Sequence, residues 1–429
     1  MELGISTTTG RANLNLPKPL ALFALAAGII TLLCYATEFY CVYKLHLNRI
    51  PYNHVTFEPI NNFADIGLFI TRYQHFHHRD FFSPSYGYAF QYPAPVGLLY
   101  LPFERQHAPV KVFLETLIAI YGGLTAWFCF ALQKRGIRFV DAAVFAGTCL
   151  IFSYPFFFEA NRANMEIFVW LLACLGVFAF LRDRPWLAAV LIGLAGACKG
   201  YPYIYLGLFF AQKKYLQMAA SVIVGIAVNL MSTAVLAGNF AIGKQGITSG
   251  LNQFRQDYVL RMRVDETGMD HSIFGFIKRF WVHIPPPPQL AHTLNMYLAV
   301  AALAAGLIYL FRVMRLPAIN QVIFLTAAAI TLPPTSFDYT LLHVYTPWVL
   351  VVFLVVGCVR EGRPLPAGFW AVWICFILLL TPQNELIYHG QRVAGQFKCL
   401  VLLVLAYLSL RYPFNPLHER ALGEDTQHA

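Results

Sequence analysis

The sequence predicts an all-α membrane protein whose chain enters the bilayer many times. Hydrophobic residues make up 58% of the 429 residues and charged residues only 12%, whereas a soluble domain carries about twice that charged fraction. Apolar runs of spanning length recur from one end of the chain to the other. Short basic loops separate many of these runs, a pattern typical of cytoplasmic loops. A sizeable soluble domain is therefore excluded.

The apolar runs form one domain, residues 1–429, with about twelve membrane helices, some of them short or broken. Segment 185–212 lies between two basic flanks, and Lys199-Gly200-Tyr201-Pro202 interrupts it. Glycine and proline both favour a helix break, so we expect two short or half-depth helices there. The first run is longer than the core of a signal peptide and is expected to remain as an anchor. The complete spans are expected at 19–42, 110–133, 138–158, 164–181, 215–237, 293–311, 317–333, 341–359, 366–382 and 393–410.

The basic residues predict which loops lie on each side of the membrane. Short loops containing Lys134, Arg182, Lys213, Arg312 and Arg360 are expected in the cytoplasm, with both termini and the tail 411–429. The outer side then receives two large loops, 43–109 and 238–292, and residues 61–77 are expected to form an interfacial helix. Because much of the net charge of +10 lies in the short loops, it does not indicate nucleic-acid binding.

The cysteines and histidines do not predict a metal site, and we expect no cofactor. Nearly all nine cysteines lie inside apolar runs and none forms a C-x-x-C pair, so they are interpreted as small buried hydrophobes. His75, His77 and His78 cluster, but their spacing is not diagnostic of metal ligands. We interpret them as histidines of the membrane interface.

Asp65 is the first candidate for chemistry, because it is a carboxylate in an outer loop just beyond the first span. Sugar transfer to a hydroxyl needs a base that takes the proton of the acceptor. A displacement with inversion needs only one such base, since a departing phosphate is already a good leaving group. The alternative is an ordinary solvated acid at the interface.

Three cations are candidates for binding a lipid phosphate. Lys199 near the tip of the broken segment is costly unless it meets an anion or water, and Tyr201 could assist it. Arg162 carries a fork that matches phosphate oxygens, and His343 inside a span is expected to have a partner. The alternatives are a snorkelling lysine, a surface arginine beside a helix cap and a satisfied core histidine.

Aromatic residues alternate from Tyr86 through Tyr88 and Phe90 to Tyr92, so in an extended chain they share one face. Such a face suits stacking on a sugar ring or seating in the membrane interface. Asn164 and Asp338 stand at the outer starts of two spans, where each could also cap a helix.

Taken in order, these motifs resemble glycosyltransferase family 87, whose members are multi-spanning enzymes of the GT-C superfamily. The resemblance runs from about the first span to beyond residue 345. It is carried by Asp65, Tyr88, Tyr92-Pro93-Ala94-Pro95, Leu101-Pro102, Asn161-Arg162-Ala163-Asn164, Leu194 to Pro202 and Ser336-Phe337-Asp338-Tyr339.

The resemblance implies an outward-facing active site that uses a polyprenyl-phosphate sugar, typically mannose, and inverts the anomeric carbon. Asp65 looks like the catalytic aspartate of the family. Members of the superfamily often carry a paired acidic motif in the first outer loop, but here Ala64 and Ile66 flank Asp65. We therefore expect a reaction that does not depend on a metal.

We expect a membrane glycosyltransferase that moves a hexose, mannose by resemblance, from a polyprenyl-phosphate donor to a glycolipid or glycan acceptor. Its expected place is the plasma (inner) membrane, with the active site facing the periplasm or exterior. Asp65 is the expected base. The donor phosphate is assigned to Lys199, Arg162, His343 and Tyr201, and the sugar or acceptor to Tyr88, Tyr92, Asn164 and Asp338. The alternatives are a transporter or flippase for lipid-linked sugars and a non-catalytic component of a polysaccharide assembly complex.

Overall fold

The computed structural model describes residues 14–47, 63, 65–67, 72–82, 90–261, 268–280, 287–383, 386–388 and 391–414. Within these ranges the regular structure is helical except for one small hairpin, in which β1 (Ile387–Tyr388) pairs antiparallel with β2 (Gln391–Arg392). The predicted all-α class is therefore confirmed. Tyr88 and most of the cytoplasmic tail expected at 411–429 lie outside the described residues.

Six helices in the described ranges are long and apolar enough to cross a membrane. They are α1 (Lys18–Tyr43), α4 (Pro109–Gln133), α10 (Tyr215–Ala237), α14 (Pro287–Phe311) with η6 (Val313–Arg315), η7 (Asp338–Val344) with α16 (Tyr345–Arg360), and α18 (Ala394–Arg411). All six coincide with predicted spans. The multi-pass architecture is thus confirmed, whereas the expected number of about twelve membrane helices stays a prediction.

The span expected at 138–158 is bent. It consists of α5 (Phe139–Ile151) and α6 (Tyr154–Arg162), which meet at an angle of 51°. Ser153 begins the second helix, because its hydroxyl accepts a hydrogen bond from the amide of Phe156 at 3.4 Å. Pro155 has no amide hydrogen to continue the α5 hydrogen-bond ladder. The segment expected to span at 138–158 is therefore two helices joined at a bend.

Further apolar helices in the described chain have only 10–17 residues, fewer than the roughly 20 that cross an average bilayer. They are α7 (Glu166–Leu181), α8 (Pro185–Cys198), η4 (Tyr201–Tyr205) with α9 (Leu206–Ala211), α15 (Ala318–Thr331) and α17 (Phe369–Leu380). The break expected in segment 185–212 is present, because α8 ends at Cys198 and Lys199 is extended.

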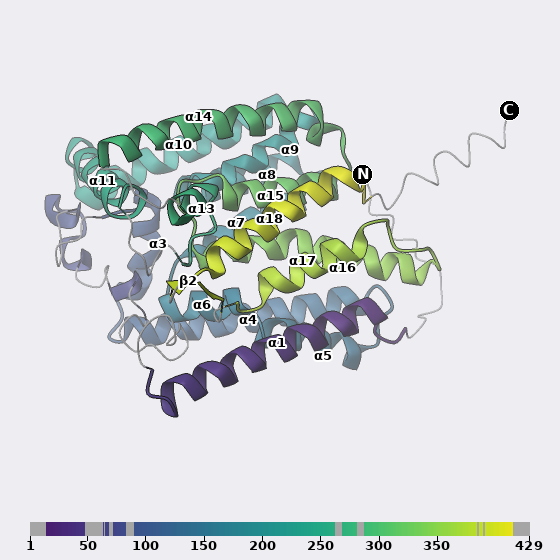
Figure 1. Ribbon diagram of the computed structural model, residues 1–429. Helices are drawn as coiled ribbons and strands as arrows, with labels where there is room; N and C mark the ends of the chain where they lie inside the picture. Colours follow the sequence, from purple (N-terminus) through teal and green to yellow (C-terminus); the bar gives the residue numbers. More distant parts are fainter. Residues whose placement is uncertain are drawn as a thin grey trace.

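The two large loops contain more helix than the sequence predicted. The first includes η2 (Arg72–His75), η3 (Arg79–Phe82) and α3 (Ala94–Glu104), and the second includes α11 (Phe240–Phe254), the π-turn η5 (Arg255–Val259) and α13 (Ile273–Phe280). Helices α3 and α11 lie towards one end of the bundle, on the left in Figure 1. Of the interfacial helix expected at 61–77, residues 65–67 and η2 are helical, and 68–71 lie outside the described residues.

The basic turns lie at the other end of the bundle. Leu14 pairs with Ile137 beside the α4–α5 turn, and Lys214 binds Asp183 at 2.9 Å between two further turns. The end of α14 meets the end of α18, since Arg312 donates to the carbonyl of Leu410 at 3.1 Å. A shared end is what the predicted cytoplasmic assignment of these turns requires.

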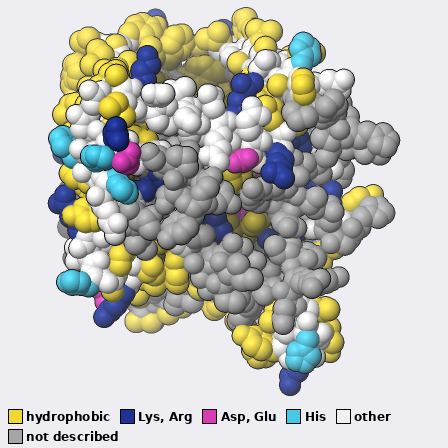
Figure 2. Space-filling view, turned by 90° about the vertical axis from the view of Figure 1, so that its left-hand side faces the viewer, with side chains coloured by type: hydrophobic (Ala, Val, Ile, Leu, Met, Phe, Trp, Pro, Cys, Tyr) yellow, Lys and Arg dark blue, Asp and Glu magenta, His cyan; other side chains and the backbone are white. Residues whose placement is uncertain are grey.

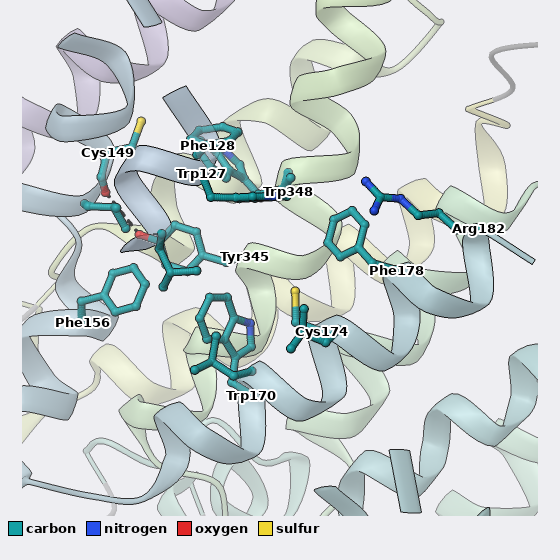
Figure 3. A pocket seen from close by; sticks show the side chains of 15 residues that line it. Trp127, Phe128, Cys149, Phe156, Trp170, Cys174, Phe178, Arg182, Tyr345 and Trp348 are labelled. Atoms are coloured by element: carbon teal, nitrogen blue, oxygen red, sulfur yellow. Dashed lines mark hydrogen bonds between the residues drawn. The ribbon is translucent and has the colours of Figure 1, made fainter. Parts of the chain in front are cut away.

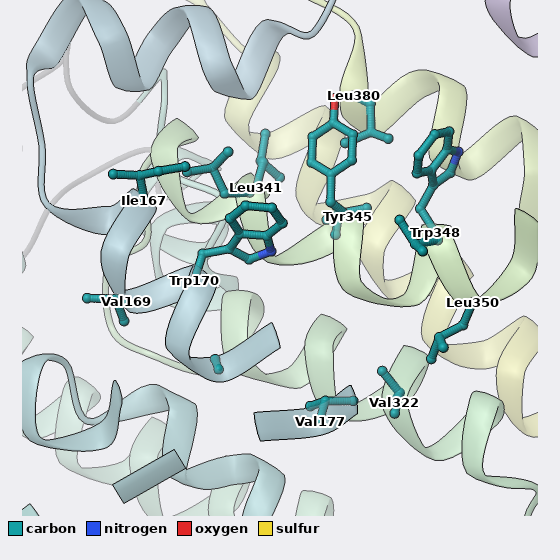
Figure 4. Packing of buried hydrophobic residues seen from close by; sticks show 14 of the residues in the cluster. Ile167, Val169, Trp170, Val177, Val322, Leu341, Tyr345, Trp348, Leu350 and Leu380 are labelled. Atoms are coloured by element: carbon teal, nitrogen blue, oxygen red, sulfur yellow. The ribbon is translucent and has the colours of Figure 1, made fainter. Parts of the chain in front are cut away.

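The core lies around η7 and α16. The membrane-length window of this element is 78% buried, whereas that of α14 is 11% buried, so α16 is central and α14 peripheral. Figure 4 shows Trp170 of α7 among Leu341, Tyr345 and Trp348. The packing thereby places the first turn of α7, which carries Glu166, and η7, which carries His343, deep in the molecule.

Candidate active site

A short turn between α6 and α7 presents two polar side chains to the same point. Helix α6 ends at Arg162, and Ala163 adopts the left-handed conformation with φ of 51°. This conformation costs a non-glycine residue on the order of 1 kcal/mol or more. The turn is held from outside, because the Tyr100 hydroxyl donates to the Ala163 carbonyl at 3.1 Å. Arg162 and Asn164 consequently flank the buried Ala163.

Asp65 is the residue that both side chains contact. Arg162 Nη2 donates to Asp65 Oδ1 at 3.1 Å, and Asn164 Nδ2 donates to Oδ2 at 2.7 Å. Asp65 is only 5% exposed. The alternative of an ordinary solvated acid is therefore wrong, and the carboxylate is held in one orientation by two donors.

Glu166, which was not among the expected site residues, organises the other half of the site. Its Oε2 lies 2.5 Å from Lys199 Nζ, and its Oε1 lies 2.9 Å from His343 Nε2. The Tyr201 hydroxyl also donates to Glu166 and lies 3.1 Å from His343 Nε2. Glu166 is fully buried, and a buried carboxylate needs such partners. Three of the four expected phosphate ligands thus converge on one carboxylate.

Asn164 joins the two halves. It donates to Asp65 through Nδ2, and its Oδ1 accepts a hydrogen bond from Lys199 at 3.3 Å. The resulting cluster, which we call the Asp65–Glu166 cluster, contains Asp65, Arg162, Asn164, Glu166, Lys199, Tyr201 and His343. Two carboxylates thereby face two permanent cations and one histidine. The charges nearly balance before any ligand arrives.

Two tyrosine rings flank Lys199. Its Nζ lies 5.8 Å from the ring centre of Tyr92 and 4.5 Å from that of Tyr339, distances typical of cation–π contacts. Burial, reinforced by the Asp65 carboxylate, raises the pKa of Tyr92 well above its ordinary value. The Tyr92 phenol is therefore neutral and can donate a hydrogen bond. Tyr339, absent from the expected site residues, adjoins Asp338 in the motif that carries the resemblance.

Asp338 belongs to a different cluster. Its carboxylate accepts a hydrogen bond from Tyr154 at 2.8 Å and lies 2.8 Å from His271 and 3.7 Å from Lys398. All four residues are buried. Because Asp338 begins η7, which also carries His343, this second cluster anchors the segment that holds the histidine in place. Contact of Asp338 with a sugar stays a prediction.

The histidine-rich segment forms a separate, exposed group. His75, His78 and Asp80 each offer one possible metal-ligand atom, and these three atoms lie within 4.8 Å of one another. Histidine nitrogens and carboxylate oxygens are ligands that a divalent ion such as zinc accepts. His77 points elsewhere, with Nδ1 3.0 Å from the Val235 carbonyl. Figure 2 shows histidine, basic and acidic side chains on this end of the molecule.

The comparisons with known proteins give one match. Residues 90–254 match the model of Glycosyltransferase family 87. The matched residues make up less than half of the chain. No curated protein and no solved structure matches significantly. The matched part contains Tyr92, Arg162, Asn164, Lys199 and Tyr201. Asp65 and His343 lie outside it and are joined to it by the contacts described above.

Proposed function

We propose that the chain is a membrane glycosyltransferase of family 87 that uses a polyprenyl-phosphate sugar as donor, and the match over residues 90–254 supports this assignment. The proposed reaction moves a hexose, mannose by resemblance, to a hydroxyl group of a glycolipid or glycan. The proposed site faces the periplasm or exterior of the plasma membrane. The observation that carries the proposal is the contact of buried Asp65 with Arg162 and, through Asn164, with Lys199.

In this proposal Asp65 is the general base. Each oxygen of its carboxylate accepts one hydrogen bond from the turn, and a carboxylate oxygen can accept more than one. Asp65 therefore keeps capacity to take the proton of an acceptor hydroxyl. The acceptor oxygen attacks the anomeric carbon, the bond to the phosphate oxygen breaks, and its electron pair leaves with the polyprenyl phosphate. Because the acceptor oxygen attacks from the side opposite to the leaving group, the configuration at the anomeric carbon is inverted.

Lys199, Arg162, His343 and Tyr201 are proposed to hold the departing phosphate. A lysine ammonium has three donors, and Lys199 directs hydrogen bonds to Glu166 and Asn164. A third donor is left for a phosphate oxygen. Buried His343 Nδ1 has no hydrogen-bond partner in the described part of the chain. Glu166 holds Lys199, His343 and Tyr201 in place, and Asp65 holds Arg162, before the donor arrives; such preorganised groups stabilise a leaving phosphate.

The sugar and the acceptor are proposed to contact the tyrosines. The Tyr92 and Tyr339 rings already flank the Lys199 ammonium, so a sugar attached to a phosphate at Lys199 would reach these rings. Asn164 lies between Asp65 and Lys199, where a sugar must bridge base and leaving group. Tyr88 and Asp338 are also proposed to contact the sugar or the acceptor.

The test is turnover of a radiolabelled polyprenyl-phosphate mannose by the purified chain in lipid nanodiscs, supplied with candidate glycolipid acceptors. Asp65→Asn keeps the shape and removes the base, so turnover should fall by about 10²–10⁴-fold while donor binding persists. Asp65→Glu should also be poor, because the longer side chain displaces the oxygen. Asp80→Asn is the matched control, because Asp80 is partly exposed and pairs with His78 in the same loop.

Two outcomes would reject the proposal. Near-normal turnover by a well-folded Asp65→Asn variant would dismiss Asp65 as the base. Movement of the labelled lipid across the bilayer without any glycosylated product would favour a transporter.

A further inference from the structure

An apolar groove runs along α7, apart from the Asp65–Glu166 cluster (Figure 3). Its cavity volume is about 210 Å³. In Figure 3, Phe156 and Tyr345 lie towards one end and Phe178 and Arg182 towards the other. The wall is formed by side chains of α4, α5, α6, α7 and α16, and Arg182 is the only charged residue among those that line it.

The groove opens towards the outside of the bundle. Leu175 and Trp127, which line it, are 54% and 43% exposed, whereas Trp348 at its base is 1% exposed. Exposed apolar side chains on membrane helices face lipid tails. A hydrocarbon chain can therefore enter this groove from the bilayer.

Three arginines gather where the groove ends. Arg182 lines the groove itself. Arg135 stacks on Phe353, with its guanidinium carbon 3.6 Å from the ring centre. The ring centre of Phe353 lies 6.3 Å from that of Trp127 in the groove wall. Burial, followed by the charges of Arg182 and Arg360, lowers the pKa of Arg135 to about 10. The charges of Arg182 and Arg360 thus both oppose that of Arg135, and Arg360 is the last residue of α16, which forms part of the groove wall.

The acids of the neighbouring turns are bound to other cations. Asp183 pairs with Lys214 at 2.9 Å, Glu361 with Arg363 at 2.7 Å, and Asp141 with Arg138 at 3.7 Å. In the described part of the chain, no ion pair joins Arg135, Arg182 or Arg360 to an acid. We call these three residues the arginine triplet. An anion at this position would offset the repulsion that Arg182 and Arg360 exert on Arg135.

We propose that the groove and the arginine triplet bind an anionic glycerophospholipid of the adjacent leaflet. One acyl chain lies in the groove between α4 and α7, and the phosphate head group lies against the arginines. Charge complementarity selects this occupant, because apolar walls alone would accept any lipid tail. The site is distinct from the proposed donor site and does not depend on the proposed glycosyl transfer.

The experiment measures lipid binding to the purified full chain in detergent by native mass spectrometry. Dioleoylphosphatidylglycerol should bind in preference to dioleoylphosphatidylcholine. Each of Arg135→Gln, Arg182→Gln and Arg360→Gln should weaken phosphatidylglycerol binding by about fivefold at low salt. Arg138→Gln and Arg363→Gln make the same change of charge at arginines already paired with acids, so binding should hardly change.

A second variant tests the groove without changing charge. Cys174→Phe places a larger side chain in it and should weaken binding of both lipids, whereas Leu187→Phe on the exposed face of α8 should not. Equal binding of the two lipids, or an unchanged preference in the triple arginine variant, would overturn the proposal. Displacement of phosphatidylglycerol by equimolar polyprenyl phosphate would assign the groove to the donor instead.

Discussion

At the residue scale, the site is organised by one carboxylate, Glu166, which several polar side chains contact. Lys199 and His343 both contact Glu166, which has no exposed surface. The lysine and the histidine stand out in the sequence, because ionisable residues are costly within membrane segments. Glu166 satisfies the same criterion, but it is the first residue of α7, a position where acidic residues are common because they favour the helix N-terminus. Only the fold shows that it holds the other two.

Glu166→Gln should destabilise the protein by about 3–5 kcal/mol, because it leaves the Lys199 ammonium buried without its counter-ion. Thermal unfolding in detergent measures this loss. The double variant Glu166→Gln with Lys199→Met removes both charges and should recover part of it. Strictly additive losses from the two single variants would contradict a direct ion pair.

The Glu104 carboxyl should make stability depend on pH. Burial raises its pKa to about 8, although the charge of Arg72 opposes the shift. The raised pKa means that the folded state favours the protonated form. The resulting stabilisation is complete below the ordinary pKa of about 4.5 and is lost as the pH rises through 8. The midpoint of thermal unfolding should therefore fall as the pH rises from 5 to 9, and it should fall less in Glu104→Gln than in the unmodified protein. Identical pH profiles for the two proteins would argue against this assignment.

At the element scale, interruptions of helices and close contacts between helices determine where the functional side chains lie. The bend between α5 and α6, the left-handed Ala163 and the extended Lys199 interrupt apolar segments where polar side chains must meet. The Lys199 break was predictable, because glycine and proline mark it. The turn at Ala163 was not, because alanine gives no local signal for a positive φ.

A substitution at Gly193 tests how closely α8 approaches α10. A Cβ atom at Gly193 would lie 2.5 Å from the Ser221 carbonyl oxygen, so the helices touch through small residues. Gly193→Val should therefore lower the unfolding free energy by about 1–3 kcal/mol. Gly147→Ala in α5 is the control, because nothing lies within 4 Å of the added Cβ. Equal stability of the two variants in a detergent melt would show that the helices are not in close contact.

At the scale of the whole molecule, the two ends of the bundle differ. Helices α3 and α11 lie at one end (Figure 1), while the basic turns and the arginine triplet, which follow or end α4, α7 and α16, belong to the other. This polarity agrees with the predicted orientation, in which the basic end is cytoplasmic. The proposed donor site and the proposed phospholipid site would then face opposite sides of the membrane.

Cysteine labelling in sealed cells should test this orientation. In a background whose nine native cysteines are replaced, Lys244→Cys in α11 should react with a membrane-impermeant maleimide from outside. Arg184→Cys, in the turn after α7, should react only after the membrane is opened. Both native side chains are exposed, so a failure to react reports sidedness. The reverse pattern would place the Asp65–Glu166 cluster nearer the cytoplasm and remove the proposed outward-facing mechanism.

The sequence by itself determined the helical class, the ends of most long helices and the polar residues that needed partners. The physical reason is local: within a bilayer, backbone hydrogen bonds must close inside each segment, and a charge in an apolar run is costly wherever the chain folds. Only the tertiary structure decided which partners meet. His343 reaches Glu166 across 177 positions of the chain, while Asp338, five residues before His343, pairs instead with His271 and Lys398. Such pairings depend on the packing of whole helices, which no local pattern of residues specifies.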